Sequence, residues 1–297
     1  MTDATPLRVG LAGAGPWARK AYAPMLAAGP ETLLAGVWAR RPEAAHELAA
    51  AHGTAAFAEF DALLERCDAV AFAVPPHVQV ELAIRAARAG RHLMLDKPLA
   101  IALEGAQRLV DEIERAGVVS QLMLTQRFRP SARRFVEAAR RVPAIGARLA
   151  FLSSAFVRGP YATTWRRQHG ALHDLGPHAF DLLVAALGPI VRIAGRGDPR
   201  RWVSLACEHQ SGAVSDVVMS GVMQLPQSVF RIEVYGEAEV VEFDGVAAAG
   251  ESPWAAARGA FADAVRTRRD GELNVRRGLM LQEVIERAMQ ALDAGER

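Results

Sequence analysis

A glycine-rich turn directly follows a short apolar segment near the start of the chain. Residues 7–12, LRVGLA, have the length of a buried β-strand, and Gly13-Ala14-Gly15 leads from them into a helix-like segment. A strand that is apolar throughout is typical of a parallel sheet covered on both faces. Glycines at a strand–helix turn leave free N–H groups at the helix N-terminus, which attract an anion. The segment therefore predicts an α/β fold with a phosphate-binding turn.

Apolar strands and helix-like segments continue to alternate up to residue 125. The helix-like segment 42–53 begins at a proline and ends at a glycine, which are ordinary helix boundaries. Strands joined by such crossover helices form a doubly wound parallel sheet. We therefore predict an N-terminal domain over residues 1–122, with further strands at 31–39, 68–74, 92–96 and 118–125.

The pattern changes after a predicted helix near residues 131–141. Longer segments follow in which apolar and polar residues alternate, as in antiparallel strands. In residues 213–225 both faces of the strand are apolar, so we expect helices on one face and a second copy of the chain on the other. We predict a second α/β domain over 123–275, followed by an amphipathic helix from 276 to the end of the chain.

Composition limits the partners to expect. The chain has 297 residues, with 35 Lys and Arg against 33 Asp and Glu and a net charge of +2. Nucleic-acid and membrane-surface binding need clustered basic residues, so we expect neither partner. No apolar run reaches the roughly 20 residues of a membrane span, and no signal segment is recognisable. Cys67 and Cys207 lie among apolar residues as expected free thiols, and we expect a cytoplasmic protein.

Lysine is rare in this chain. Only Lys20 and Lys97 are lysines among the 35 cations, and the other 33 are arginines. Lys97 follows the predicted strand 92–96, at the carboxyl edge where parallel sheets bind ligands. Its ammonium can donate to a substrate oxygen and stabilise developing negative charge, although an ion pair with Asp96 is the alternative. His77, after Pro75-Pro76, either lines this edge or only opens a helix.

The glycine turn fits a dinucleotide. Gly13 permits the tight turn, Gly15 lets a pyrophosphate approach the backbone, and Ala18 allows close packing of helix on strand. Pro16 is tolerated at a first helical position. The alternative is a glycine-rich turn of another α/β fold.

The end of the second strand bears on which dinucleotide is bound. An NAD site usually has a carboxylate there for the ribose hydroxyls, but this strand ends in Ala39-Arg40-Arg41. Guanidinium groups suit a 2′-phosphate, so we predict NADP and consider NAD the weaker candidate. The alternative is that both arginines are solvated loop residues.

A cluster of histidines and carboxylates follows in the second half. Asp174 and His178 are four residues apart, and Asp181 follows three further, so one helical face can carry all three, within the approximation set by Gly176-Pro177. An imidazole beside a carboxylate is suited to proton transfer. His169 and His173 share the same spacing, but without further clustered ligands we expect no metal.

These segments together resemble the glucose–fructose oxidoreductase and inositol dehydrogenase (Gfo/Idh/MocA) family. The resemblance rests on Gly13-Ala14-Gly15, VPPHVQVELA, AGRHLMLDKPLA, QRFRP and GALHDLGPHAFDLL, and it spans nearly the whole chain. Asp96 stands where the family more often has Glu, and His169 where a glycine is common. The resemblance implies an N-terminal Rossmann domain, a C-terminal α/β domain with an open, mostly antiparallel mixed sheet, and a last helix packed back on the first domain.

The resemblance also implies site residues and an activity. It implies a cis Lys97–Pro98 peptide and a homodimer or homotetramer formed through the open sheet. Hydride exchange with the secondary alcohol of a small sugar-like or cyclic polyol is implied; a non-catalytic NADP sensor and a redox-cofactor glycosidase are the alternatives. The implied catalytic residues are Lys97, Asp174 and His178. Together with the sequence patterns above, the residues expected at the cofactor are Gly13, Gly15, Pro16, Trp17, Ala18, Ala39, Arg40, Arg41, Pro75, Pro76, His77 and Lys97. The residues expected at the substrate are Arg127, Tyr161, Trp165, Arg166 and His169. Trp165 is equally compatible with a place in the core.

Overall fold

The computed structural model describes residues 5–159 and 162–295 of the chain. The described chain forms two compact units. The first comprises the residues up to Met123 together with Trp254–Leu279, and the second comprises Leu124–Pro253 and the residues from Met280 onward. Each unit has its own six-stranded sheet.

The sheet of the first unit is parallel throughout, as predicted. Its order is β3-β2-β1-β4-β5-β6, in which the direction of winding reverses between β1 and β4. Neighbouring strands pair in parallel across the whole sheet. This is the doubly wound Rossmann arrangement, with strands β1 (Leu7–Ala12), β2 (Thr32–Trp38), β3 (Ala56–Phe57), β4 (Ala69–Phe72), β5 (His92–Leu95) and β6 (Ser120–Leu122).

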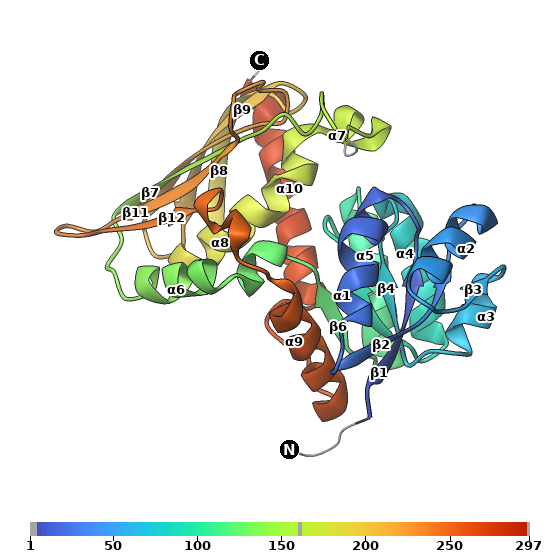
Figure 1. Cartoon of the computed structure of the whole chain (residues 1–297). Helices are drawn as coiled ribbons and strands as arrows, with labels where there is room; N and C mark the ends of the chain where they lie inside the picture. The colour runs from blue at the N-terminus through green and yellow to red at the C-terminus, as the bar shows by residue number, and fades with distance from the viewer. Residues whose placement is uncertain (1–4, 160–161, 296–297) are drawn as a thin grey trace. The chain divides into compact units, whose positions relative to one another are not determined.

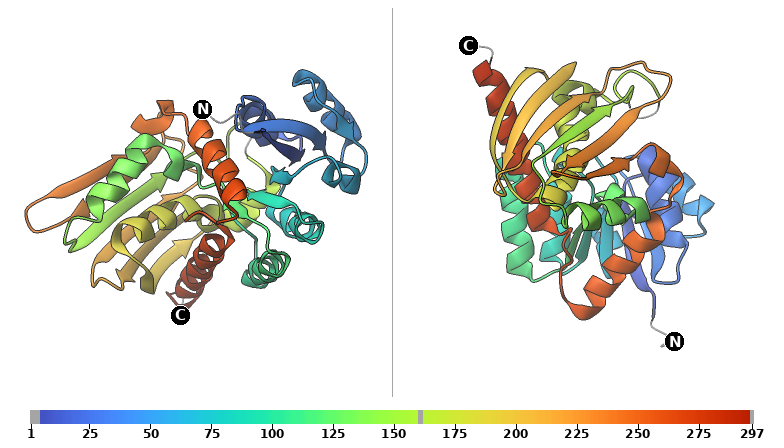
Figure 2. Two further views of the ribbon diagram at one scale, coloured as in Figure 1. Left: turned by 90° about the horizontal axis from the view of Figure 1, so that it is seen from below. Right: turned by 90° about the vertical axis from the view of Figure 1, so that its left-hand side faces the viewer.

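Helices cover both faces of this sheet. Right-handed crossovers bring the helices before and after β2 to one face and those flanking β5 to the other, and the left view of Figure 2 shows the two sets on opposite sides of the strands. Gly117 ends α5 in the left-handed conformation that favours glycine. The helices of this unit are η1 (Ala18–Tyr22) and, labelled in Figure 1, α1 (Ala23–Ala27), α2 (Pro42–Ala51), α3 (Phe60–Leu64), α4 (Pro76–Arg88), α5 (Leu103–Ala116) and α9 (Trp254–Thr267).

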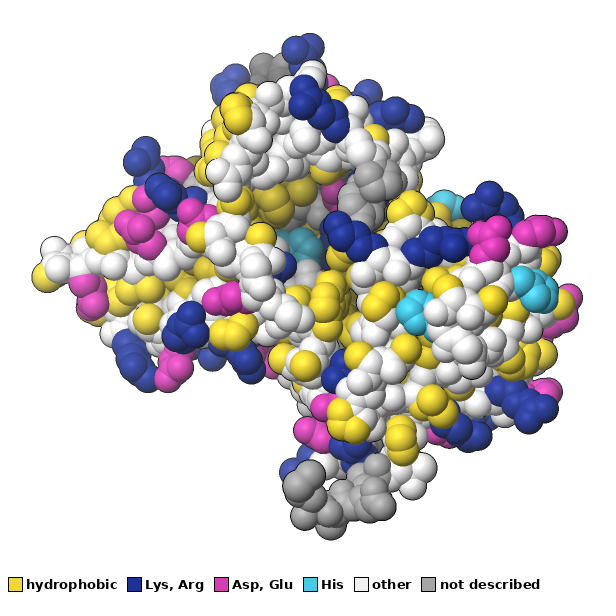
Figure 3. All heavy atoms as spheres, in the orientation of Figure 1, with side chains coloured by type: hydrophobic (Ala, Val, Ile, Leu, Met, Phe, Trp, Pro, Cys, Tyr) yellow, Lys and Arg dark blue, Asp and Glu magenta, His cyan; other side chains and the backbone are white. Residues whose placement is uncertain are grey.

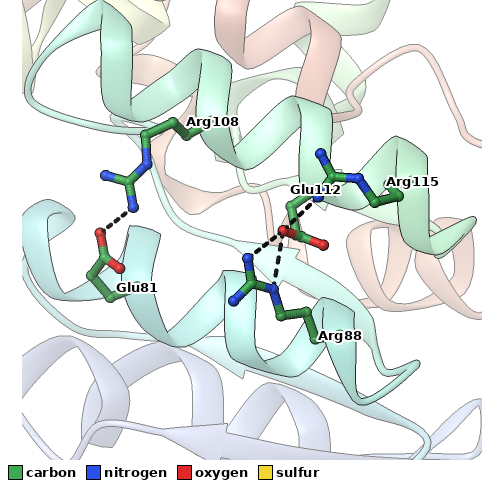
Figure 4. Close-up of polar contacts among 5 residues, drawn as sticks. All are labelled: Glu81, Arg88, Arg108, Glu112 and Arg115. Carbon is green, nitrogen blue, oxygen red and sulfur yellow. Dashed lines mark hydrogen bonds and ion pairs between the residues drawn. The ribbon is translucent and has the colours of Figure 1, made fainter.

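Ion pairs join α4 to α5 on the outer surface (Figure 4). Glu112 on α5 accepts from Arg88 on α4 at 2.8 Å and from Arg115 on its own helix at 2.9 Å. Arg108 and Glu81 form a second pair between the two helices at 3.0 Å. Because the arginines are exposed, these ion pairs contribute little to the stability of the fold, although they link the outer surfaces of α4 and α5.

The sheet of the second unit is mixed and mostly antiparallel, again as predicted. Its order is β12-β11-β7-β10-β9-β8, and only β7 and β10 pair in parallel. The strands are β7 (Gly146–Leu152), β8 (Ile190–Asp198), β9 (Trp202–His209), β10 (Val214–Ser220), β11 (Val229–Tyr235) and β12 (Val240–Asp244). The helices are η2 (Thr125–Phe128), α6 (Pro130–Ala139), α7 (Thr164–Asp174), α8 (Gly176–Leu187), η3 (Ala247–Gly250) and α10 (Val275–Gly295).

One face of this sheet is packed and the other is exposed. On the packed face Phe151 stacks on Phe230 with ring centroids 4.1 Å apart, and Phe135 of α6 contacts Phe243 at 5.7 Å. The opposite face, whose strands face the viewer in the right view of Figure 2, carries Trp202, Val214 and Val240, which are 40–50% exposed. A hollow of about 650 Å³ lies on this exposed face, lined by residues that include Arg148, Asp216, Val218, Val229, Arg231 and Glu233.

The two C-terminal helices are assigned to the two units differently from what the sequence predicts. Residues 254–275 were expected in the second domain and the last helix on the first, but α9 belongs to the first unit and most of α10 to the second. Arg287 of α10 donates to the carbonyl of Ile190 in β8 at 3.0 Å. An apolar stripe predicts that a helix docks, but it does not name the surface on which it docks.

The surface charge is mixed, and both cysteines are buried. Acidic and basic side chains are interspersed over the visible surface of both units (Figure 3). Cys67 and Cys207 are buried free thiols, as expected, and burial raises their pKa values to about 11 and about 12. None of the helices in the described ranges is long and apolar enough to cross a bilayer.

Candidate active site

The glycine turn lies at the carboxyl end of β1, between the ends of β2 and β4. Gly13 donates its N–H to the carbonyl of Trp38 at 2.7 Å and has a φ of +120°. A Cβ at Gly13 would lie 2.4 Å from the carbonyl oxygen of Ala73, so both backbone conformation and space require glycine there. A Cβ at Gly15 would meet no atom within 4 Å. The protein's own packing therefore does not require glycine at position 15, whereas the close approach of a diphosphate to this backbone would.

The helix that starts at this turn is anchored on both sides. Pro16 is its first helical residue, and Ala18 is fully buried against the sheet, as the sequence predicts. Arg19 donates from Nε to the carbonyl of Ala14 at 3.1 Å and from Nη2 to Glu47 on α2 at 2.9 Å. Arg19, which is not among the predicted site residues, thus braces the turn and adds a positive charge beside it. The turn thus fits a bound dinucleotide diphosphate.

The predicted 2′-phosphate residues lie just beyond β2. Ala39 is buried, whereas Arg40 and Arg41 are exposed and Arg41 precedes the first residue of α2. Because Arg40 and Arg41 are exposed, their guanidinium groups reach solvent at the carboxyl edge of the sheet.

Trp17 lies on the first turn after the glycines. Its ring contacts that of Trp254 edge to face, with centroids 5.8 Å apart.

Two further segments reach the same edge of the first sheet. After β4, Pro75 precedes α4, Pro76 is buried as its first residue, and His77 is exposed. After β5, Asp96 and Lys97 are half-buried, and the Lys97–Pro98 peptide is cis, as the resemblance implies. Asp96 accepts the backbone N–H of Lys97 on Oδ1 at 2.9 Å. Burial and the Asp96 carboxylate raise the pKa of Tyr22 well above its usual value.

In the second unit, Asp174 closes α7 and His178 lies in the first turn of α8. Leu175 between the two helices has helical dihedral angles, so the backbone is helical from Ala171 through α8 and the predicted common face is approximately formed. α7 is interrupted at Gly170, whose φ is +72° and where a Cβ would lie 2.3 Å from the Pro199 carbonyl oxygen. His178 is half-buried, and Asp174 is only 4% exposed.

The Asp174 carboxylate is paired with an arginine from its own helix. Arg166 donates from Nε to Oδ1 of Asp174 at 3.0 Å. The Arg166 guanidinium also lies over the ring of Trp165 at 4.9 Å. Arg166, predicted as a substrate residue, thus contacts both the predicted catalytic carboxylate and Trp165, the neighbouring predicted substrate residue.

The remaining predicted residues lie in different surroundings. Arg127 is 8% exposed and donates from Nη1 to both oxygens of Asp181 at 3.2 Å, so its guanidinium is engaged inside the unit rather than at a surface. The rings of His169 and His173 are 5.3 Å apart. No group of three or more metal-binding side chains was found within residues 5–159 and 162–295. Tyr161 lies outside the described residues.

The structure therefore places the predicted site residues in two groups, one in each unit. The first gathers the glycine turn, Arg40, Arg41, His77 and Lys97 at one sheet edge. The second gathers Asp174, His178, Arg166 and Trp165 around the junction of α7 and α8. The first has the architecture of a Rossmann nucleotide-binding unit.

Comparison with known proteins identifies the family. Residues 7–124 match the model of the oxidoreductase family with an NAD-binding Rossmann fold named for GFO, IDH and MocA, and residues 134–242 match the GFO/IDH/MocA C-terminal domain. Together these matches cover more than half of the chain. The chain belongs to the Gfo/Idh/MocA oxidoreductase family.

Individual relatives are sugar and polyol enzymes. The chain is 34% identical over 212 residues to the dTDP-3,4-didehydro-2,6-dideoxy-alpha-D-glucose 3-reductase of Streptomyces violaceoruber, a match that covers 67% of this chain and 60% of that enzyme. It is 28% identical over 134 residues to the scyllo-inositol 2-dehydrogenase (NAD(+)) of Bacillus subtilis strain 168, which covers 44% of this chain and 38% of that enzyme. These matches span less than two thirds of either enzyme.

Solved structures share the fold along nearly the whole chain. GenD2 from gentamicin A biosynthesis, in a complex with NAD, superposes with a TM-score of 0.87 at 22% identity, covering 98% of this chain and 95% of that one. The UDP-N-acetylglucosamine 3-dehydrogenase of Acidithiobacillus ferrooxidans superposes with a TM-score of 0.86 at 21% identity, covering 97% and 98%.

Proposed function

We propose that the protein is a nicotinamide-dependent dehydrogenase or reductase that acts on a secondary alcohol or ketone of a small sugar-like or cyclic polyol substrate. The observation that carries the proposal is the common position of the Gly13–Gly15 turn and Lys97 at the carboxyl edge of one parallel sheet. This edge, where the winding reverses, is where such sheets bind dinucleotides. The named sugar and inositol relatives support the substrate class.

The proposal assigns roles to Lys97, His178 and Asp174. When bound, the cofactor supplies or accepts the hydride at nicotinamide C4. Lys97 donates a hydrogen bond to the reacting oxygen and stabilises negative charge on it. His178 exchanges the proton of the reacting hydroxyl as general acid and base. Asp174, held by Arg166 at 3.0 Å, orients the imidazole or a neighbouring substrate hydroxyl and is not assigned as the base.

The proposed cofactor is NADP. Support comes from Arg40 and Arg41, which are exposed just after β2, and from the absence of a carboxylate between Val37 and Arg41 in the sequence. Guanidinium groups recognise a 2′-phosphate through charge-assisted hydrogen bonds. The solved relative in a complex with NAD favours the other cofactor, so the two must be compared directly.

The exposed face of the second sheet is the proposed contact between copies of the chain. Trp202, Val214 and Val240 expose apolar surface there, around the hollow of about 650 Å³. Apolar patches of this kind mark contacts between proteins. Formation of a homodimer or homotetramer would bury this face. Light scattering measures the mass of the assembly and so tests this proposal.

We also propose that the protein is cytoplasmic, because both cysteines are free thiols.

A stepwise experiment tests this function. The melting temperature is first compared with NADPH, NADH and their oxidised forms, and Arg40→Ala/Arg41→Ala is the matched variant. We expect NADPH to stabilise the wild type most and to lose this advantage in the variant; greater stabilisation by NADH contradicts the NADP assignment. Turnover of a sugar, polyol and keto-sugar panel is then followed at 340 nm with the preferred cofactor. Cofactor binding without turnover would indicate a sensor, and turnover without net cofactor change a glycosidase.

A further inference from the structure

The loop that carries the catalytic lysine, residues 96–99, is held by one buried side chain. Gln79 on α4 is only 1% exposed. Its Oε1 accepts the backbone N–H of Asp96 at 2.7 Å, and its Nε2 donates to the Asp96 carbonyl at 2.9 Å. The same Nε2 lies 3.1 Å from the Leu99 carbonyl oxygen and 3.4 Å from that of Pro98.

Glutamine is chemically suited to this position. Its side-chain amide carries the same donor and acceptor pair as a peptide group, so Gln79 pairs with Asp96 as a neighbouring strand would. This pairing continues one residue beyond Leu95, where β5 ends. Backbone groups buried without a partner cost about 1–3 kcal/mol each, so the loop needs such a partner where it leaves the sheet.

The contacts fix the backbone on both sides of Lys97. Asp96 before it is bonded through its N–H and carbonyl, and Leu99 after it through its carbonyl. Asp96 also accepts the Lys97 N–H at 2.9 Å. The backbone of Gln79 is itself fixed in the first turn of α4 by a hydrogen bond to the Pro75 carbonyl at 3.0 Å. Gln79 therefore links the backbone from which the Lys97 side chain extends to the first turn of α4.

We propose that Gln79 is a positioning residue that sets where the Lys97 ammonium stands at the carboxyl edge of the sheet. The proposal deepens the proposed function, because that function gives Lys97 its contact with the reacting oxygen. The position of the ammonium can be measured without any turnover, so the two proposals can fail separately.

Because the chain has only two lysines, the reactivity of Lys97 can be measured relative to that of Lys20. Brief acetylation with the N-hydroxysuccinimide ester of acetic acid, followed by mass spectrometry of peptides, gives the rates at Lys97 and Lys20 in the same molecule. Lys20 is exposed on the first helix and serves as the internal reference. The ratio of the two rates, taken from pH 7 to pH 10, reports the accessibility and basicity of the Lys97 ammonium. A merely structural loss of stability leaves this ratio unchanged in the folded protein.

Three variants define the result. Gln79→Met keeps the length and removes every side-chain hydrogen bond, and Gln79→Asn keeps the amide but is one methylene too short. Gln121→Met is the matched control, because Gln121 is 6% exposed in the same unit and donates to the Ala257 carbonyl at 3.0 Å. We expect the Lys97 to Lys20 ratio to rise about threefold or more in both Gln79 variants and to stay unchanged in the control, since a loosened loop opens locally. An unchanged ratio in a folded Gln79 variant overturns the proposal.

Two further measurements complete the test. In the wild type, the Asp96 amide hydrogen should exchange with solvent as slowly as those of β5, and fast exchange overturns the proposal without any substitution. With a turned-over substrate, Gln79→Met should lower kcat about tenfold or more while the cofactor Kd changes less than about twofold. A kcat within twofold of wild type contradicts the positioning role. Altered lysine labelling in a protein that turns over no substrate contradicts the proposed function alone.

Discussion

Arg166 and Asp174 form an ion pair within α7 that spans the kink at Gly170. The Nε atom of Arg166 lies 3.0 Å from Oδ1 of Asp174, and their side chains are 18% and 6% exposed. A buried carboxylate needs a partner of opposite charge, since an isolated charge is costly to remove from water. The pair therefore both joins the two segments of the helix and fixes the carboxylate assigned to the active site.

Removal of the arginine should affect both stability and turnover. Arg166→Met leaves Asp174 without this partner and should lower the free energy of unfolding by about 2 kcal/mol, because a buried charged group loses its partner. Urea denaturation followed by circular dichroism measures the change, and kcat should fall with it. Arg167→Met is the control, because Arg167 is the adjacent residue and is exposed. Equal stabilities of the two variants would contradict a structural role for the pair.

The Arg127–Asp181 pair should behave as a structural element. Arg127 and Asp181 are 8% and 1% exposed, so either single substitution leaves a buried charge. Arg127→Met and Asp181→Leu should each destabilise the protein by about 3–5 kcal/mol, whereas the double variant should recover much of that loss. A double-mutant cycle in urea measures the coupling. Additive losses in the double variant would show that the two groups do not interact.

Local patterns were sufficient to predict the two sheets and to place Gly13, Gly15 and Lys97 at the carboxyl edge of the first one. The strand–turn–helix pattern around Gly13 and Gly15 predicts a phosphate site within six residues, and Lys97 is conspicuous because lysine is rare in the chain. The partners that hold these groups were not foreseen, because they come from distant parts of the sequence. Gln79 contacts a loop 17 residues away, and Arg127 contacts Asp181 54 residues away.

Helical periodicity also does not identify the surface against which a helix packs. The apolar stripe of α10 includes Leu281, Ile285 and Leu292, all buried, but the spacing alone does not distinguish β8 of the second unit from the first unit. Likewise, the QRFRP segment singles out Arg127 but does not indicate that its guanidinium pairs with Asp181. Sequence patterns predict which face of a helix is buried and which residues lie at a sheet edge. The partner of each side chain depends on the assembled fold.

The two glycines of the turn should respond differently to the same substitution. Gly13→Ala places a Cβ 2.4 Å from the Ala73 carbonyl oxygen at a φ of +120°, which should cost about 2–4 kcal/mol of stability. Gly15→Ala meets no atom within 4 Å and should leave the melting temperature nearly unchanged while weakening dinucleotide binding about tenfold or more. Thermal unfolding and titration with NADPH and NADH separate the two effects. Unaltered binding in Gly15→Ala would contradict the assigned diphosphate site.

His209 should make stability dependent on pH. It is 2% exposed, and its Nδ1 and Nε2 atoms lie 2.9 Å from the Gly188 carbonyl oxygen and the Ser215 hydroxyl. Burial lowers the pKa of His209 below its ordinary value, so the unfolded chain binds a proton more readily than the folded one. Its contribution to stability is therefore present above about pH 6.5 and is lost as the pH falls below that value, by up to about 1.4 kcal/mol per pH unit.

Substitution by a side chain that does not titrate isolates this effect. His209→Gln keeps one donor and one acceptor, so the variant should lose less stability than the wild type between pH 6.5 and pH 5. His46→Gln, at an exposed position on α2, controls for the loss of an imidazole. Burial also lowers the pKa of His92, so some loss of stability on acidification should remain in the variant. Parallel pH profiles of unfolding free energy for wild type and His209→Gln would show that His209 is not kept neutral by the fold.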